Sequence, residues 1–185
     1  MATRSVEKWK SKRWFSVIAP QLFGEKELAT IPANDDKALI GRIIKVNLSW
    51  ITQKPEHSML SIGLRIIDTT SNSAKTKVEF LRNSFAYIHS FVKRGTSAIY
   101  TRDVLEDKNK NKFVAKFLIV IDKTTKRKKT AIRKLASDYL VNFAKEHSAE
   151  EFLNAVINNT IQNEGTKLIN PIAKVRRFEL NKIEF

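Results

Sequence analysis

Hydrophobic and polar residues alternate in three segments of the first half of the chain. In residues 41–50, the apolar residues from Ile44 to Trp50 fall on one face, and polar residues stand between them. Residues 58–68 and 73–82 repeat the pattern. A period of two is typical of strands that are buried on one face only. We therefore predict three antiparallel strands here, with a turn between the last two.

The hydrophobic period changes to that of a helix after residue 83. Residues 83–95 carry apolar positions at helical spacing and end in a glycine, which predicts a short helix. Alternating segments then flank the polar run 107–111. They predict a hairpin whose two strands are residues 96–106 and 112–122.

Two longer helices and a last strand complete the pattern. Residues 130–147 place their apolar side chains on one helical face, and residues 148–159 open with Ser148 and Glu151 at the spacing of a capping box. The stretch 169–185 is predicted to contain a closing strand.

This order of elements indicates the α+β class. About six antiparallel strands would best avoid open edges by curling up. We therefore predict a small antiparallel β-barrel of about six strands, with flanking helices packed outside. Residues 1–13 are expected to form a basic N-terminal arm, and residues 14–185 a single domain that combines the barrel and the helices. Residues 30–41 are expected to form a loop or a single turn.

Composition narrows the functional classes. The chain has 185 residues, of which 42% are hydrophobic, enough for one folded domain. It contains no cysteine, which excludes disulfides and thiolate chemistry. No apolar run has the length of a membrane helix, and the N-terminus lacks the apolar centre of a signal peptide. We expect a soluble protein of the cytoplasm that has no contact with a membrane.

The net charge of +15 and the isoelectric point of about 10.1 favour a polyanionic partner. The basic residues concentrate in three blocks: an N-terminal block, a block before the first long helix, and a block in the last strand. The N-terminal block contains Arg4, Lys8, Lys10, Lys12 and Arg13; the second contains Lys123, Lys126, Arg127, Lys128, Lys129, Arg133 and Lys134; the third contains Lys174, Arg176, Arg177 and Lys182.

The second block conflicts with the helix that follows it. Thr124 or Thr125 is a natural N-cap, so the cations of residues 126–129 fall in or near the first helical turn. Cations at this positive end of the helix dipole are unfavourable by about 0.3–1 kcal/mol each when exposed. Free amide groups beside cations form a strong phosphate site. We therefore favour phosphate binding here over a merely solvated charged face.

Aromatic residues stand among the cations of the first block. Trp9 lies between lysines and is the candidate for stacking on unpaired bases. Trp14 and Phe15 lead into an apolar run, and we expect both to anchor in the core. No motif that reads a base sequence is present, so shape and charge should determine binding.

Signals for catalysis are weak. His57, His89 and His147 do not stand at metal-ligand spacing, and no phosphate-binding glycine loop or nucleophile elbow occurs. Asp35 and Asp36 could hold a divalent ion, although adjacent aspartates are usually turn or cap residues. We predict no catalytic residue, no metal site, no cofactor and no small-molecule substrate. A metal-dependent nuclease that uses the two aspartates is kept as an alternative.

Five segments in order resemble a known family. They are "KWKSKRWFSVIAPQLFG", "LATIPANDDKALIGRIIKVNL", "SFVKRGTSAIY", "KKTAIRKL" and "NPIAKVRRFELNKIEF". Together they resemble the S-three-a-e (eS-one) family of archaeal and eukaryotic small-ribosomal-subunit proteins. The short chain is similar to the archaeal members.

The resemblance implies a structural role in the ribosome. It implies a β-barrel with flanking helices on the platform of the small subunit, near the messenger RNA exit, with small-subunit ribosomal RNA and neighbouring ribosomal proteins as partners. An RNA-binding or chaperone-like regulator outside the ribosome remains the alternative. The candidate RNA-binding residues are Lys8, Trp9, Lys10, Lys12, Arg13, Lys126, Arg127, Lys128, Lys129, Arg133, Lys134, Lys174, Arg176 and Arg177.

Overall fold

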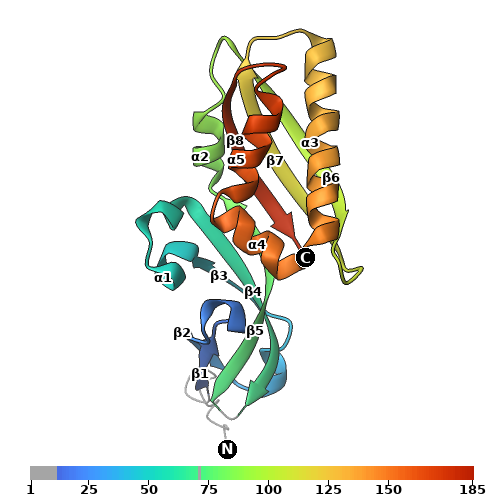
Figure 1. Ribbon diagram of the computed structural model, residues 1–185. Coiled ribbons are helices and arrows are strands. Elements are labelled where there is room, and N and C mark those ends of the chain that lie inside the picture. The colour runs from blue at the N-terminus through green and yellow to red at the C-terminus, as the bar shows by residue number, and fades with distance from the viewer. Residues whose placement is uncertain (1–11, 71) are drawn as a thin grey trace, which may run out of the picture.

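A computed structural model describes residues 12–70 and 72–185. The molecule is elongated, with the start of α3 near one end and the start of β1 near the other (Figure 1). Its strands are β1 (Arg13–Ile18), β2 (Glu27–Ala33), β3 (Ile43–Asn47), β4 (Leu60–Thr70), β5 (Ser73–Asn83), β6 (Thr96–Glu106), β7 (Lys112–Asp122) and β8 (Val175–Glu184). Its α-helices are α1 (Leu48–Thr52), α2 (Phe85–Ser90), α3 (Lys126–Glu146), α4 (Ala149–Ile157) and α5 (Thr160–Ile169). Short 3-10 turns cover Gln21–Phe23, Asp36–Ala38 and Pro55–Met59.

The strands form one branched sheet around β5. The main path runs β2-β1-β5-β8-β7-β6, and β4 pairs with both β3 and β5. Near its start β5 pairs with β1 in parallel, and at its end it pairs with β8 in antiparallel fashion. One strand thus joins the β1–β4 end of the molecule to the β6–β8 end.

The α+β class is confirmed, but the predicted six-stranded barrel is wrong. The described residues form eight strands, and the sheet is not closed: β2 and β6 are the two ends of its main path. The physical reason is that α3, α4 and α5 lie against one face of β6, β7 and β8 (Figure 1). Because these helices bury that face, the sheet does not need to curl to shield it.

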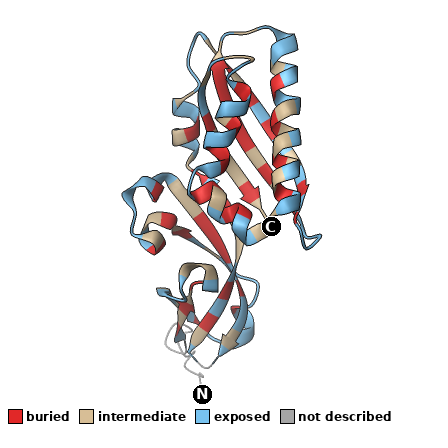
Figure 2. Ribbon diagram, viewed as in Figure 1, coloured by how far each residue is buried: buried red, intermediate tan, exposed pale blue. Residues whose placement is uncertain are grey.

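The main core lies between this helical layer and the sheet. Buried residues line the helix-facing side of the strands and the sheet-facing sides of the helices (Figure 2). Phe113 and Phe117 of β7, Phe152 of α4 and Phe178 of β8 are its buried aromatic members. In β7, every second residue from Phe113 to Ile121 belongs to it.

The opposite face of β6–β8 is covered only in part. Ile88 of α2 packs on Leu118 and Val120 of β7. Further along β6, Tyr100 and Val104 have 46% and 60% of their surfaces exposed. This face of the sheet is therefore open beyond α2 in the described structure.

Several predicted elements are confirmed. The hairpin has strands of residues 96–106 and 112–122, as predicted. The capping box forms, because the Ser148 hydroxyl accepts from the Glu151 amide and the Glu151 carboxylate accepts from the Ser148 amide. Strand β8 closes the chain as expected, and α3 begins at Lys126 with the basic run in its first turn.

The predicted strand of residues 41–50 ends early. Strand β3 stops at Asn47, whose side chain accepts a hydrogen bond from the Ser49 amide at 3.0 Å and caps α1. The chain therefore turns before Trp50 reaches the strand face. Trp50 is 76% exposed instead of buried.

Helix α5 was not predicted, and Gly165 explains its packing. Its buried face includes Ile161, Gly165 and Ile169, at a spacing of four residues. A β-carbon at Gly165 would lie 1.9 Å from Cε1 of Phe178, so the glycine allows the phenylalanine ring to contact the helix backbone. Glycine lowers helix propensity, which weakens the helical signal in the sequence.

Candidate nucleic-acid interface

Three connecting segments meet at the end of the molecule where α3 begins (Figure 1). The Lys123 amide donates to the Gly95 carbonyl at 3.2 Å, which joins the β7–α3 connection to the α2–β6 connection. The Asp122 amide donates to the Lys174 carbonyl at 3.3 Å, which adds the α5–β8 connection. Segments far apart in sequence are thus held side by side by backbone hydrogen bonds.

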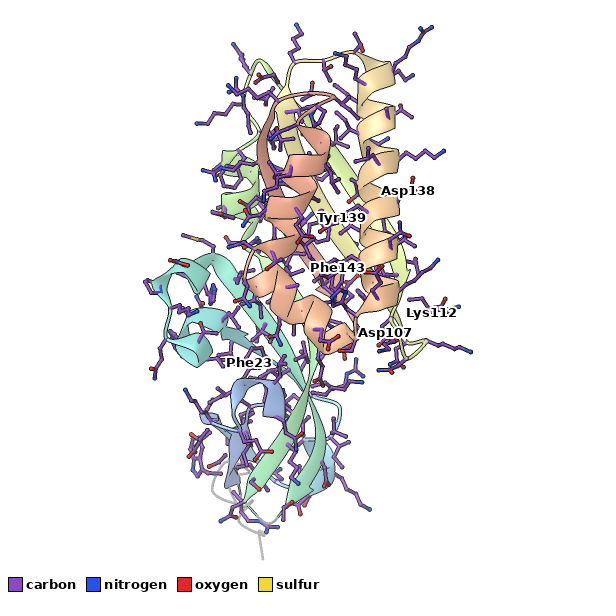
Figure 3. All side chains as sticks on the ribbon, viewed as in Figure 1. Phe23, Asp107, Lys112, Asp138, Tyr139 and Phe143 are labelled. Carbon is purple, nitrogen blue, oxygen red and sulfur yellow. The ribbon has the colours of Figure 1, made fainter. Side chains whose placement is uncertain are left out.

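Cations gather on these segments, and we call the group the cationic pole. Figure 3 shows nitrogen-tipped side chains projecting outward at this end. All members are exposed except Lys129, which is half-buried. The members are Lys93, Arg94, Lys123, Lys126, Arg127, Lys128, Lys129, Lys174 and Arg176. The structure thereby brings the second and third basic blocks together and adds Lys93 and Arg94, which belong to none of the predicted blocks.

The first turn of α3 contains no group of its own that offsets this charge. Thr125 is the N-cap, as expected, but its side chain makes no capping hydrogen bond. No acidic residue occupies the first turn. Within the described part of the three segments, Asp122 is the one carboxylate, and it accepts a hydrogen bond from Nε of Arg176. The pole therefore keeps a large positive excess beside free helix amides.

Besides Arg176, two more of the predicted RNA-binding arginines contact other parts of the protein. The Arg177 guanidinium lies over the Phe91 ring, with its Cζ 5.3 Å from the ring centroid. Nε of Arg133 donates to the Tyr100 carbonyl at 3.3 Å. Both arginines remain exposed, as does Lys134.

The first basic block lies at the other end of the molecule. Lys8, Trp9 and Lys10 fall outside the described residues. Lys12 is exposed, and Arg13 is exposed at the start of β1. The structure therefore does not bring this block together with the cationic pole (Figure 1).

Strand β1 corrects the expected burial of Trp14. Phe15 is buried as expected, but Trp14 is 63% exposed. The burial of β1 alternates, with Phe15 and Val17 inside, so Trp14 lies on the outer face with Lys12. This exposed aromatic beside cations was missed, although the alternation of Phe15 and Val17 was a usable signal.

A hollow of about 630 Å³ opens between α5, β8 and α2. Arg176 and Arg177 lie along it, beside Tyr87 and Glu179. Burial raises the pKa of Glu179, and burial also raises the pKa of Tyr87, whose hydroxyl donates to Glu179 at 3.5 Å. Its lining is mainly polar, and it contains neither a serine nor a cysteine that could act as a nucleophile.

The residues considered for catalysis do not assemble into a site. His57 is buried and hydrogen-bonds through Nδ1 to Thr52, whereas the His89 ring packs on Phe85. Asp35 and Asp36 flank the start of a 3-10 turn. Across residues 12–70 and 72–185, no group of three metal-ligating side chains comes together. In the same residues, no helix is both long and apolar enough to cross a membrane.

Comparisons with known proteins identify one family. The model of the Ribosomal S3Ae family matches residues 1–185. A Pyrobaculum aerophilum protein named "Small ribosomal subunit protein eS1" is 32% identical over 180 residues, covering 95% of this chain and 80% of its own. A Desulfurococcus amylolyticus protein of the same name is 30% identical over 179 residues, covering 95% and 83%. A third, from Methanobrevibacter smithii, is 28% identical over 178 residues, covering 94% and 91%.

Proposed function

Because the chain belongs to the Ribosomal S3Ae family, we propose that it is a structural constituent of the small ribosomal subunit and binds its ribosomal RNA. The archaeal relatives that carry the name of a small-subunit protein support this role. The same relationship favours a protein without catalytic activity that resides in the cytoplasm as part of the ribosome.

The cationic pole is the observation that carries the proposal. Nine cations on three joined segments face solvent or lie half-buried around a helix start that has no acid in its first turn. A phosphate at this position would accept from the free amides and neutralise the lysines at once. An RNA backbone supplies such phosphates at regular spacing, and a folded RNA supplies them at high density.

The mechanism that follows is charge neutralisation at two separate contacts. The cationic pole binds one part of the RNA, and Lys12, Arg13 and the exposed Trp14 contact another part from the opposite end. Lys8, Trp9 and Lys10 extend the second contact. The sheet between the two ends acts as a spacer.

The proposal includes a location within the subunit. On the resemblance described above, the protein lies on the platform near the messenger RNA exit, beside other ribosomal proteins. Phosphate contacts position a protein on RNA without reading its sequence, so the folded shape of the RNA would select this place.

Binding to RNA and association with the subunit test the proposal together. Purified protein should bind small-subunit ribosomal RNA, and its affinity should fall steeply as the salt concentration rises. In a plot of log affinity against log salt concentration (the log–log salt slope), each neutralised phosphate should steepen the fall by about 0.7–0.9. In cell extracts at moderate salt, it should sediment with the small subunit. A flat salt dependence would contradict the use of charge for phosphates. A protein that binds RNA but stays in the soluble fraction would be a regulator outside the ribosome.

A further inference from the structure

Four cations form a row across the open face of the sheet. Arg102 of β6 is the direct cross-strand partner of Lys116 of β7. Lys116 is in turn the partner of Lys182 of β8, and Lys182 is the partner of Arg82 of β5. We call these four residues the cationic row. With neighbouring strands about 4.8 Å apart, the row spans about 14 Å.

The row lies on the face that the long helices do not cover. Directly paired residues of neighbouring strands share a face of the sheet. Phe117 and Ile183, which follow Lys116 and Lys182, belong to the core beneath α3–α5, so the row points the opposite way. On this face α2 packs on Leu118, which leaves the row beyond the helix.

The protein offsets only part of this charge. Glu184, two residues after Lys182, lies within 3.1 Å of Lys116 Nζ and also bonds to Lys182. Hydrogen bonds from Lys182 and then Lys116 lower the pKa of Glu184, which keeps it ionised. Arg82 and Arg102 are exposed, and neither forms an ion pair with a described carboxylate. Four cations against one carboxylate leave a local excess of three positive charges.

Like charges directly opposite one another destabilise a sheet. The fold alone therefore gains nothing from this arrangement, and a bound anion would relieve the repulsion. Two of the four cations are arginines, whose planar guanidinium groups suit bidentate contacts with phosphate.

Aromatic side chains border the row. Tyr100 stands two residues before Arg102, on the same face of β6, and is 46% exposed. Phe80 stands two residues before Arg82, and Lys182 Nζ lies 5.3 Å from the centroid of its ring. Tyr100 is thus exposed and Phe80 is half-buried. Cations in a line with aromatic rings beside them are features that bind a single nucleic-acid strand.

We propose that the cationic row is a further RNA-binding surface, which holds the phosphate backbone of an RNA strand across β6, β7, β8 and β5. This inference rests on the proposed function, because it takes RNA as the partner. The even spacing of the cations matches a chain of regularly spaced charges better than it matches an acidic protein segment, whose carboxylates are unevenly placed.

The row is invisible in the sequence because its members come from four strands. They are spread from residue 82 to residue 182, and only Lys182 belongs to one of the three basic blocks. Cross-strand register alone places them together.

The test compares two double variants of the full chain. Arg82→Gln with Arg102→Gln removes the two cations that have no described carboxylate partner and leaves the lysines with Glu184. Lys26→Gln with Lys37→Gln is the matched control, since it removes two exposed cations that belong to none of the three proposed RNA contacts. The measurement is the affinity for naked small-subunit ribosomal RNA as a function of salt, with thermal unfolding as a check on the fold.

We expect the Arg82/Arg102 variant to lower the log–log salt slope by about 1.4–1.8, since each lost phosphate contact removes about 0.7–0.9. The control should keep the parent's slope. If both variants bind as the parent does, the row does not contact RNA and the inference is wrong. If the Arg82/Arg102 variant then also fails to enter assembled subunits, the row contacts an acidic protein neighbour instead. If the parent itself does not bind the RNA, the proposed function falls and this inference with it.

Discussion

Helices α3 and α4 begin in opposite ways. At α4, the Ser148 hydroxyl accepts from the Glu151 amide at 3.3 Å, and the Glu151 carboxylate accepts from the Ser148 amide at 2.8 Å. Glu150 and Glu151 both stand in its first turn, where negative charge complements the helix dipole. At α3, Thr125 makes no side-chain cap, and the first turn holds cations and no acid.

Under the proposed function, the difference separates a helix start that serves the fold from one that serves binding. The start of α4 satisfies its free amides within the protein. The start of α3 does not, and its charges oppose the dipole. The start of α4 shows that this chain can form a complete capping box. The missing cap at α3 is therefore best explained by an external anion that would bind its free amides.

The largest effect is expected from removing the charge at α3. Replacing Lys126, Arg127, Lys128 and Lys129 with glutamine should lower the log–log salt slope of RNA binding by about 1.4–3.6, for two to four lost phosphate contacts. The melting temperature should stay the same or rise by about 1–3 °C, because repulsion with the dipole is relieved. Titration with RNA and thermal unfolding measure the two effects.

The two effects have opposite signs, which makes the result easy to interpret. A control with four exposed lysines removed elsewhere, at Lys26, Lys37, Lys54 and Lys75, should keep most of the affinity at the same net charge. A quadruple α3 variant that unfolds more easily and binds RNA as well as the parent would mean that these cations serve the fold.

The second expected effect concerns the caps themselves. Ser148→Ala removes a side chain that accepts a hydrogen bond from the Glu151 amide, and should cost about 1 kcal/mol, or about 2–4 °C in melting temperature. Thr125→Ala removes a side chain that makes no capping bond, and should leave the melting temperature nearly unchanged. Thermal unfolding of both variants measures the difference. Equal decreases in melting temperature for the two variants would show that the starts of α3 and α4 are capped to the same extent.

The smallest expected effect is the pH dependence of stability that comes from the carboxylates at the start of α4. The hydrogen bond from the Ser148 amide lowers the pKa of Glu151. Asp107 accepts from the Ala149 amide at 3.3 Å, and although burial opposes ionisation, its hydrogen bonds with Asn111, Ala149 and Asn109 lower its pKa.

A lowered pKa in the folded state fixes the sign of this effect. The carboxylates contribute stability above their unfolded pKa of about 4, and this stability is lost as the pH falls through the folded pKa. The melting temperature should therefore fall below about pH 4, and less steeply in Glu151→Gln than in the parent. Parallel curves of melting temperature against pH for the two proteins would show that Glu151 does not contribute to this pH dependence.

Short-range patterns predicted much of the fold. The hairpin of β6 and β7 needs only the five residues between its strands, and the capping box needs only Ser148 and Glu151. The barrel prediction failed because closure depends on what covers the sheet. Helix α5 contributes to that cover, and its signal was weakened by Gly165, whose value depends on a contact with Phe178.

The sequence predicted the basic residues of the candidate interface but not how they come together in space. The run from Lys126 to Lys129 and its position at a helix start could be inferred locally. That Lys174 and Arg176 lie beside it depends on the backbone hydrogen bond from the Asp122 amide to the Lys174 carbonyl, which connects residues about 50 positions apart. Lys93 and Arg94 were missed because two cations before a glycine look like an ordinary helix end.

Strand β5 has a mechanical consequence. Its eleven residues extend for about 33–36 Å, with β1 bonded near one end and β8 at the other. Strand β4 is bonded along most of its length, which stiffens it. Bending the molecule between its ends would therefore require breaking hydrogen bonds between β4 and β5, and could not occur by the movement of a flexible loop. The distance between Arg13 and the cationic pole is set by β5 and then by β8, so under the proposed function the protein would act as a ruler between two segments of RNA.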